Sequence, residues 1–507
     1  MEKCIRLTGH DLTIEDVLAV AREKVRVEIS EDASERIAAS NRIVSDIAAS
    51  GVPTYGISTG FGEMSKVYIN QEQNKALQRN LIISHACAVG NPFPDEVVRA
   101  IMLLRLNTHC SGYSGVSPEV PLILKEMLNK DVIPYVPEKG SLGASGDLAN
   151  LAQIACVMIG EGEVIENGKR VPARDALKAK GIDPVVLKGK DGLGIINGTP
   201  VMAALGCLAL HDAERCLQAA NMGASLVFEA FRGIRAALDP RIQEIRHHEG
   251  QQEVAAFILK MLEGSSSVDT REGDVQDPYT LRCVPQVHGA SFDALSYCRS
   301  VLEREINAVT DNPIVFPDTH EIISGGNFHG QPLALTLDFL AIATAELANI
   351  SERRIERLVN PALSGNLPAF LVKDGGVNNG YMIPQYTAAC LVSENKVLAH
   401  PASVDSIPSS ANKEDHVSMG AIAARKAREV VWNTRQVLAI EWLVAAQACE
   451  LRGVEKYGRG TASMMEMIRK AVPHYNEDRL MYADLETMYQ LLSDESTYES
   501  ILSALSD

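Results

Sequence analysis

Aromatic residues are scarce in this 507-residue sequence, where Phe, Trp and Tyr make up 5% while 46% of the residues are hydrophobic. Basic residues are also few, because 48 Lys and Arg stand against 65 Asp and Glu and leave a formal net charge of -17. No basic run is long enough to follow a phosphate backbone, so we expect no nucleic-acid partner. The hydrophobic content excludes a disordered or fibrous chain and predicts a large folded core.

Membrane and secretion signals are also missing. The N-terminus carries acidic residues from Glu2 onward and no apolar segment, which is not the pattern of a signal peptide. The longest uncharged run, Gly192 to His211, contains Gly, Asn and Pro, so we interpret it as a buried loop that leads into a helix. The ten cysteines contain no C-x-x-C pair and are expected to be mostly core thiols. Together these features predict a cytoplasmic protein with no membrane partner.

The chain divides by pattern into two parts. Residues 1–200 alternate short helical stretches with Gly and Pro, which is typical of a loop-rich domain. Residues 201–507 have few helix breakers and predict a bundle of long helices with a helical C-terminal tail. One helix is expected from Pro332 to Val359, buried nearly all round in its first half, and another from about Met419 to Arg452. Since no strand-like run of useful length alternates with them, the predicted fold is mainly α, and a doubly wound sheet or (β/α) barrel is disfavoured.

Two Gly-rich strings invite a chemical interpretation. Gly56 to Gly60 matches G-x-S-x-G, the serine turn of α/β-hydrolases, but the pattern is short and lacks a predicted sheet beneath it, so a plain turn at Ser58 is favoured. The second string, Lys139 to Asp147, reads KGSLGASGD. Its glycines permit positive φ values and close backbone approach, and Asp147 is a possible helix cap.

The Ala-Ser-Gly within the second string permits ring closure. If the amide nitrogen of Gly146 attacks the carbonyl carbon of Ala144, cyclisation releases one water and Ser145 loses a second. The product is a 4-methylidene-imidazol-5-one, an electrophile that no encoded side chain provides. Glycine is needed at the third position because a Cβ would obstruct the attack.

This string resembles the signature of the histidine, phenylalanine and tyrosine ammonia-lyases and their aminomutase relatives. The resemblance implies a fumarase/aspartase-like architecture, with a central bundle of long helices and an N-terminal domain carrying the ring, so that no metal or external cofactor is required. Six further blocks follow the family's order: YGISTGFG at residues 55–62, LQRNLIISH ending at His85, INGTP at 196–200, QDPYTLRC at 276–283, GGNFHGQP at 325–332 and SANKEDHVSM at 410–419.

The resemblance also implies roles for single residues. Tyr55 is similar to the base that removes the β-proton, and since a phenol ordinarily titrates at about 10, it would need a site that favours the phenolate. Tyr279 and Asn197 match residues that position the substrate and the ring. Arg282 matches the partner of the substrate carboxylate, a task that suits a planar guanidinium, and Phe328 matches a residue beside the ring.

Two positions indicate the substrate. Ser84-His85 is similar to the pair in histidine enzymes, and Glu414 also resembles them, since a carboxylate accepts a hydrogen bond from an imidazole N–H. The plainer interpretations are a satisfied core histidine at His85 and an ion pair of Glu414 with Lys413. Departures from the family pattern are Ser58, Asn150 and Lys413, and Val284 and His288 depart from the histidine enzymes. Residues 62–64 and 248–251 are similar to the tyrosine aminomutases.

The resemblance therefore implies an enzyme that eliminates ammonia from L-histidine to give trans-urocanate, and a homotetramer with active sites that combine three subunits. A tyrosine or phenylalanine ammonia-lyase or 2,3-aminomutase using the same ring stays open. A serine hydrolase at Ser58 is a distant alternative, and a structural paralogue without activity is the least expected.

Overall fold

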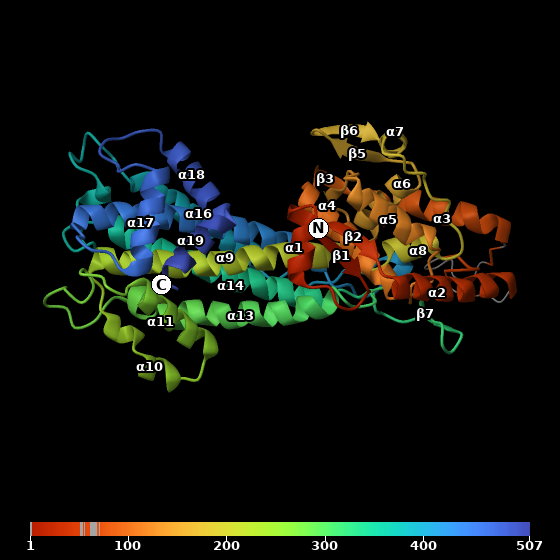
Figure 1. Cartoon of the computed structure of the whole chain (residues 1–507), viewed down its shortest axis with the longest axis horizontal. Helices are drawn as coiled ribbons and strands as arrows, with labels where there is room; N and C mark the ends of the chain where they lie inside the picture. The colour runs from red at the N-terminus through yellow and green to blue at the C-terminus, as the bar shows by residue number, and fades with distance from the viewer. Residues whose placement is uncertain (1–2, 51–53, 55, 61–67, 70, 507) are drawn as a thin grey trace. The chain divides into compact units, whose positions relative to one another are not determined.

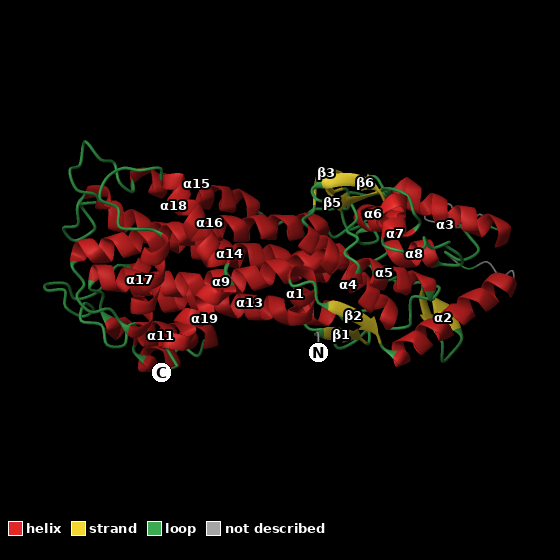
Figure 2. Ribbon diagram, turned by 45° about the horizontal axis from the view of Figure 1, so that its top comes forward, coloured by secondary structure: helices red, strands yellow, loops and turns green. Residues whose placement is uncertain are grey.

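The computed structural model describes residues 3–50, 54, 56–60, 68–69 and 71–506, and most of them are helical (Figures 1 and 2). The chain forms two compact units. Unit 1 is Met1–Leu208, Arg299–Asp338 and Pro401–Arg425; unit 2 is Ala209–Cys298, Phe339–His400 and Lys426–Asp507. The predicted mainly α fold is confirmed, whereas the domain boundary at residue 200 stays a prediction.

Short helices and two-stranded sheets make up most of unit 1. Its helices are α1 (Ile14–Arg22), α2 (Glu31–Ser50), α3 (Gln71–His85), α4 (Asp95–Cys110), α5 (Glu119–Asn129), α6 (Leu148–Met158), α7 (Ala173–Ala179), α8 (Asp191–Ile196) and the 3-10 helix η4 (Ser410–Asn412). Its strands are β1 (Cys4–Leu7), β2 (Arg26–Ile29), β3 (Val89–Pro92), β4 (Pro137–Lys139), β5 (Glu163–Glu166), β6 (Lys169–Pro172), β7 (Ile314–Phe316) and β8 (Glu321–Ile323). The pair β1–β2 is parallel and the other three pairs are antiparallel. No sheet in the described residues exceeds two strands, so the exclusion of a doubly wound sheet or barrel is confirmed for that part of the chain.

Helix α4 is the core of unit 1. All its residues from Val97 to Cys110 are buried, including Arg99 and Arg105. Apolar residues on every side of a helix predict this burial, and a charged side chain within such a helix must find its partners inside the protein.

Four long helices follow the predicted pattern: α9 (Pro200–Phe231), α13 (Val284–Glu305), α14 (Gln331–Val359) and α16 (Gly420–Arg452). The predicted helices at 332–359 and 419–452 are confirmed to within one residue at each end. The second ends where Gly453 takes a φ of +71°, a left-handed conformation that glycine adopts without strain.

The prediction that the first half of α14 is buried all round is wrong. Leu335, Phe339 and Ile342 are 55%, 42% and 45% exposed. Their spacing places them on one face, which nothing in the single chain covers, while leucines such as Leu337 and Leu340 on the opposite side are fully buried. By length and composition α14 could also cross a membrane, a property that it shares with buried core helices.

In unit 2 the long helices lie side by side (Figures 1 and 2) and are joined by hydrogen bonds. Trp442 Nε1 on α16 donates to the Ala219 carbonyl of α9 at 2.9 Å, and Ser291 Oγ on α13 donates to the Ala343 carbonyl of α14 at 2.8 Å. The remaining elements of unit 2 are η2 (Arg235–Leu238), α10 (Pro240–Glu244), α11 (Glu249–Met261), α12 (Tyr279–Arg282), η3 (Ala369–Leu371), α15 (Met382–Leu398), α17 (Arg459–Ala471), α18 (Met481–Ser493) and α19 (Glu495–Ala504).

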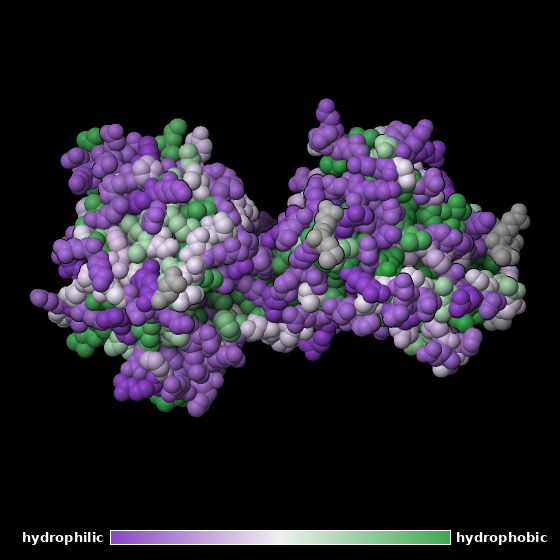
Figure 3. Space-filling model, in the orientation of Figure 1, coloured by the Kyte–Doolittle hydropathy of each residue, from purple (hydrophilic) through white to green (hydrophobic). Residues whose placement is uncertain are grey.

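The uncharged run from Gly192 to His211 is buried as predicted, but it is not a loop at its start. Residues 191–196 form the short helix α8, and only Asn197 to Thr199 separate it from α9. The face of the molecule drawn in Figure 3 is mostly hydrophilic, in keeping with the many charged residues. All ten cysteines are free and six of them are buried, as the sequence predicts for core thiols.

Candidate functional site

The Ala-Ser-Gly string lies in unit 1 as a tight turn. Gly143 and Gly146 form an isolated bridge, the Gly146 N–H lies 3.3 Å from the Gly143 carbonyl oxygen, and Ala144 and Ser145 form the tip. Ser145 has a φ of +53° and Gly146 a φ of +83°. A Cβ on Gly146 would lie 1.9 Å from the Gly198 carbonyl oxygen, so the backbone path at this position requires glycine.

Glu414 faces the tip of this turn. Its Oε1 accepts from Ser145 Oγ at 3.2 Å and its Oε2 accepts from Ser409 Oγ at 3.0 Å. The segment that carries Glu414 is held against the turn, because the Met419 N–H donates to the Leu142 carbonyl at 3.0 Å. A partly buried carboxylate is therefore fixed beside Ser145.

His85 lies at the C-terminal end of α3 and its Nδ1 is 3.1 Å from Ser84 Oγ. Burial lowers the pKa of His85, while the backbone contact with Leu81 and the negative charge of Glu414 oppose the decrease. The imidazole is only partly buried, so it is not the satisfied core histidine of the plainer interpretation. The structure thus brings Ser145, Glu414 and His85 into one neighbourhood.

Asn197 and Gly198 pass beneath the same turn. The Gly198 N–H donates to the Ser145 carbonyl at 3.3 Å, and the Asp147 N–H donates to the Gly198 carbonyl at 2.8 Å. Asn197 is 3% exposed, and its Nδ2 donates to the Asn312 carbonyl at 3.2 Å. Its Oδ1 is buried and has no hydrogen-bond partner among the described residues.

Phe328 lies in a loop of unit 1 that is tied at both ends. Asn327 Nδ2 donates to the Val309 carbonyl at 3.3 Å, and His329 Nε2 lies 3.3 Å from the His416 carbonyl, two residues after Glu414. The partly buried Phe328 therefore lies between a residue bound to Val309 and a residue bound to His416. Val309 is three residues before Asn312, which contacts Asn197, and His416 is two residues after Glu414.

Asp147 is a helix cap, as predicted, but for a distant helix. Although it precedes α6, its carboxylate makes no bond there; Oδ2 accepts from the N–H groups of Val201 and Met202 at the start of α9, at 2.8 and 3.1 Å. Burial raises the pKa of Asp147 to about 7, opposed by these two hydrogen bonds. The turn is thereby anchored to the N-terminus of a long helix.

Ser58 does not form a hydrolase turn. It is 4% exposed, its Oγ accepts from the Thr54 N–H at 2.8 Å, and the described residues around it contain no larger sheet on which such a turn could stand. Other departures are also buried: Asn150 donates to the Pro137 carbonyl at 2.6 Å, and His288 Nδ1 lies 2.7 Å from Asn221 Oδ1.

Tyr279 and Arg282 belong to unit 2, on the short helix α12. Tyr279 is 70% exposed and its ring centroid lies 4.8 Å from the guanidinium carbon of Arg282. Arg282 Nε donates to the Asp277 carbonyl at 3.1 Å, and its terminal nitrogens have no partner among the described residues. Both line a pocket of about 930 Å³ within unit 2. Tyr55 lies outside the described residues, so its predicted role stays a prediction.

The turn fits the ring that its sequence predicts. The tight turn folds the Gly146 nitrogen back toward the Gly143 carbonyl, and glycine at position 146 avoids a clash with the Gly198 carbonyl. The residue before Gly198, Asn197, offers a buried and unpartnered acceptor in its Oδ1. The described residues contain no cluster of His, Cys, Asp and Glu that could hold a metal ion.

Sequence reasoning missed the charged residues beneath the site. Arg105 Nη1 donates to the Asn197 carbonyl at 2.5 Å, and Lys190 pairs with Asp311 at 2.9 Å in full burial. Single charged residues usually lie on the surface, so the sequence does not predict that these three are buried. The one available signal is that Arg105 lies in a helix that is apolar on all sides.

Comparison with known proteins identifies the family. A profile described as aromatic amino acid lyase matches residues 12–470. The histidine ammonia-lyase of Treponema denticola is 70% identical over 502 residues, which cover 99% of both chains. Among solved structures, histidine ammonia-lyase from Trypanosoma cruzi superposes with a TM-score of 0.92 at 40% identity, covering 99% of this chain and 96% of that one. Tyrosine aminomutase from Streptomyces globisporus superposes with a TM-score of 0.95 at 37% identity, covering 99% of both. Over nearly its whole length, then, the chain that carries this Ala-Ser-Gly turn belongs to the aromatic amino acid lyase family of carbon–nitrogen lyases.

Proposed function

We propose that this protein eliminates ammonia from L-histidine to give trans-urocanate, using a 4-methylidene-imidazol-5-one ring formed from Ala144, Ser145 and Gly146. The observation that carries the proposal is the contact of Ser145 with Glu414 beside His85, on a turn whose geometry requires glycine at position 146. The 70% identity to a histidine ammonia-lyase supports the same substrate.

When formed, the ring would supply an electrophile that turns the substrate amino group into a better leaving group. Residues of the chain, contributed by different subunits, would bind and orient the substrate around it. Arg282 has unpartnered terminal nitrogens suited to a carboxylate, Asn197 Oδ1 is an acceptor for an N–H, and Tyr55 would take the β-proton. Holding these groups around one substrate is mainly a matter of position.

The preference for histidine rests on Glu414. Its Oε1 accepts from the Ser145 hydroxyl, which ring formation removes as water, so that acceptor becomes available to the imidazole N–H of a substrate. A phenyl ring offers no N–H there, and the carboxylate would be left without its bond. The neighbouring imidazole of His85 would pack against the substrate ring.

We further propose that the enzyme is a homotetramer whose active sites combine side chains of different subunits. Three apolar residues on one face of α14 are exposed in the single chain, and exposed aromatic side chains such as Trp432 on α16, 49% exposed, lie elsewhere on the long helices. Surfaces of this kind mark protein interfaces. Ten free thiols are consistent with a cytoplasmic location.

The test is a substrate panel on the purified full-length chain. L-Histidine should give the absorbance of urocanate, while L-tyrosine and L-phenylalanine should give little coumarate, cinnamate or β-amino acid. Ser145→Ala should abolish turnover, and the parent chain, but not this variant, should weigh about 36 Da less than its encoded mass because two waters are lost. Ser58→Ala should retain activity and serves as the control.

The tyrosine aminomutase likeness favours one alternative. If tyrosine is converted to its β-isomer and histidine is not, the ring is supported and the substrate assignment is wrong. A parent chain with its full encoded mass contradicts the ring itself.

A further inference from the structure

Asn197 is held in one orientation. The carbonyl of Asn312 can only accept, so the Asn197 group 3.2 Å from it must be the Nδ2 amide, and Oδ1 necessarily points the other way. That oxygen is buried without a partner among the described residues. A buried acceptor left unpaired is unfavourable unless a ligand N–H occupies it.

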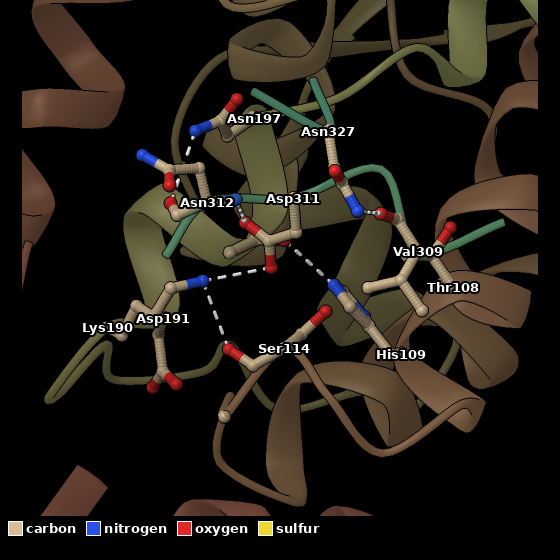
Figure 4. Close-up of polar contacts among 12 residues, drawn as sticks. Thr108, His109, Ser114, Lys190, Asp191, Asn197, Val309, Asp311, Asn312 and Asn327 are labelled. Atoms are coloured by element: carbon tan, nitrogen blue, oxygen red, sulfur yellow. Dashed lines mark hydrogen bonds and ion pairs between the residues drawn. The ribbon is translucent and has the colours of Figure 1, made fainter. Parts of the chain in front are cut away.

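The backbone N–H of Asn312 is itself held by a buried ion pair (Figure 4). The Asn312 N–H donates to Asp311 Oδ1 at 2.6 Å, and Asp311 Oδ2 accepts from Lys190 Nζ at 2.9 Å. Lys190 Nζ also donates to the Ser114 carbonyl at 3.0 Å, and the Asn312 side-chain oxygen accepts from the Gly325 N–H at 2.8 Å. Neither Lys190 nor Asp311 is exposed at all.

Steric limits couple this segment to the turn above it. A Cβ on Gly198 would lie 2.1 Å from the Thr310 carbonyl oxygen and 2.9 Å from Arg105 Nη1, so residues 197–198 are clamped between Arg105 and the 310–312 segment. The Gly198 N–H in turn donates to the Ser145 carbonyl. A shift of Asn312 would therefore disturb the position of Asn197 beside Ser145.

We propose that Lys190 and Asp311 are positioning residues, which hold the Asn312 carbonyl so that Asn197 Oδ1 faces the amino group of the substrate. The inference rests on the proposed function, because it takes a substrate amine as the missing donor. Burying two charges is unfavourable in itself, and such a pair is understandable where it fixes geometry that packing alone would not.

The test is a double-mutant cycle in the full-length enzyme between Lys190→Met and Asn197→Ala. Lys190→Met should lower kcat/KM for L-histidine by about tenfold to a hundredfold, the range expected when a reacting group is misplaced. In the Asn197→Ala background the same change should cost less than about threefold, since residues acting through one contact are not additive. If the loss of kcat/KM in the double variant equals the product of the two single losses, the proposal is overturned.

Binding supplies a second measurement. The Kd of 3-(imidazol-4-yl)propionate, which lacks the amino group, should change by less than about twofold in Lys190→Met, because only the contact to the amine is disturbed. An equal loss of affinity for this analogue would show general damage to the pocket and contradict the proposal. Lys188→Met is the matched control, since Lys188 pairs at 2.9 Å with the exposed Glu119 at the surface.

Ring formation is checked by intact mass in every variant. Because Lys190→Met leaves Asp311 buried without its partner, Lys190→Met/Asp311→Asn provides a variant with neither charge, and it should show the same loss of kcat/KM. If both variants lack the ring, the pair serves ring formation and the proposal is overturned.

If the parent deaminates another aromatic amino acid instead of histidine, only the substrate assignment fails, and the cycle is run on that substrate's amino group. A parent that deaminates none overturns both.

Discussion

At the scale of the residue, Glu414 is the proposed link between the turn and the substrate. Its two oxygens accept from Ser145 and Ser409, which fixes the plane of the carboxylate. We expect Glu414→Gln to lower kcat/KM for L-histidine by about a hundredfold or more, because the amide loses the charge and presents a donor where an acceptor is needed.

The measurement is the rate of urocanate formation. Asp415→Asn is the matched control, because this neighbouring carboxylate is exposed, and it should keep activity within about threefold. Unchanged kcat/KM in Glu414→Gln would exclude Glu414 as the partner of the imidazole.

At the scale of the element, the carboxylate of Asp147 caps the N-terminus of α9. Burial raises the pKa of Asp147 from 3.8 to about 7. A carboxyl group with a higher pKa in the folded state binds its proton more tightly there, so its contribution to stability is complete below about pH 4 and is lost as the pH rises through about 7. Asp147→Asn should therefore remove a slope of up to about 1.4 kcal/mol per pH unit from the stability of the protein in that window.

Thermal unfolding across this pH range, compared between parent and variant, measures the slope. Asp239→Asn is the control: Asp239 also caps a helix, α10, but it is only partly buried and Arg241 lowers its pKa to about 2. That variant should follow the parent between about pH 4 and pH 7. If the plot of stability against pH for Asp147→Asn has the same slope as that of the parent and is only displaced, the raised pKa of Asp147 is contradicted.

The elements also show what the sequence could predict. Pro332 and Gly453 bracket helices whose apolar spacing is unmistakable, so α14 and α16 follow from local rules. Lys190 and Asp311 are 121 residues apart and meet only through the tertiary fold, so no local pattern announces them. The sequence predicts a cap at Asp147, but which helix it caps depends on that same fold. The family motifs point to Asn197 and Glu414 without the contacts that orient them.

At the scale of the whole molecule, the exposed apolar face of α14 is expected to pack against another subunit. We expect Phe339→Asp/Ile342→Asp to dissociate the proposed tetramer and lower activity more than about tenfold, since charges would be buried at an apolar interface. Light scattering after gel filtration measures the mass. Val186→Asp, at an apolar loop position that is 70% exposed, should leave the assembly intact. Active monomers of either variant, or of the parent on dilution, would refute a composite site.

The contact between Ser145 and Glu414 has a consequence for freshly made protein. Under the proposed function, Ser145 Oγ occupies the acceptor of Glu414 until the two waters are lost, so the chain without the ring would be a latent form in which this hydroxyl blocks the substrate. Folding and maturation are then separate events: a preparation can be fully folded yet only partly competent. The number of histidine molecules bound per chain would therefore report the fraction of chains in which the ring has formed, not the fraction that is folded.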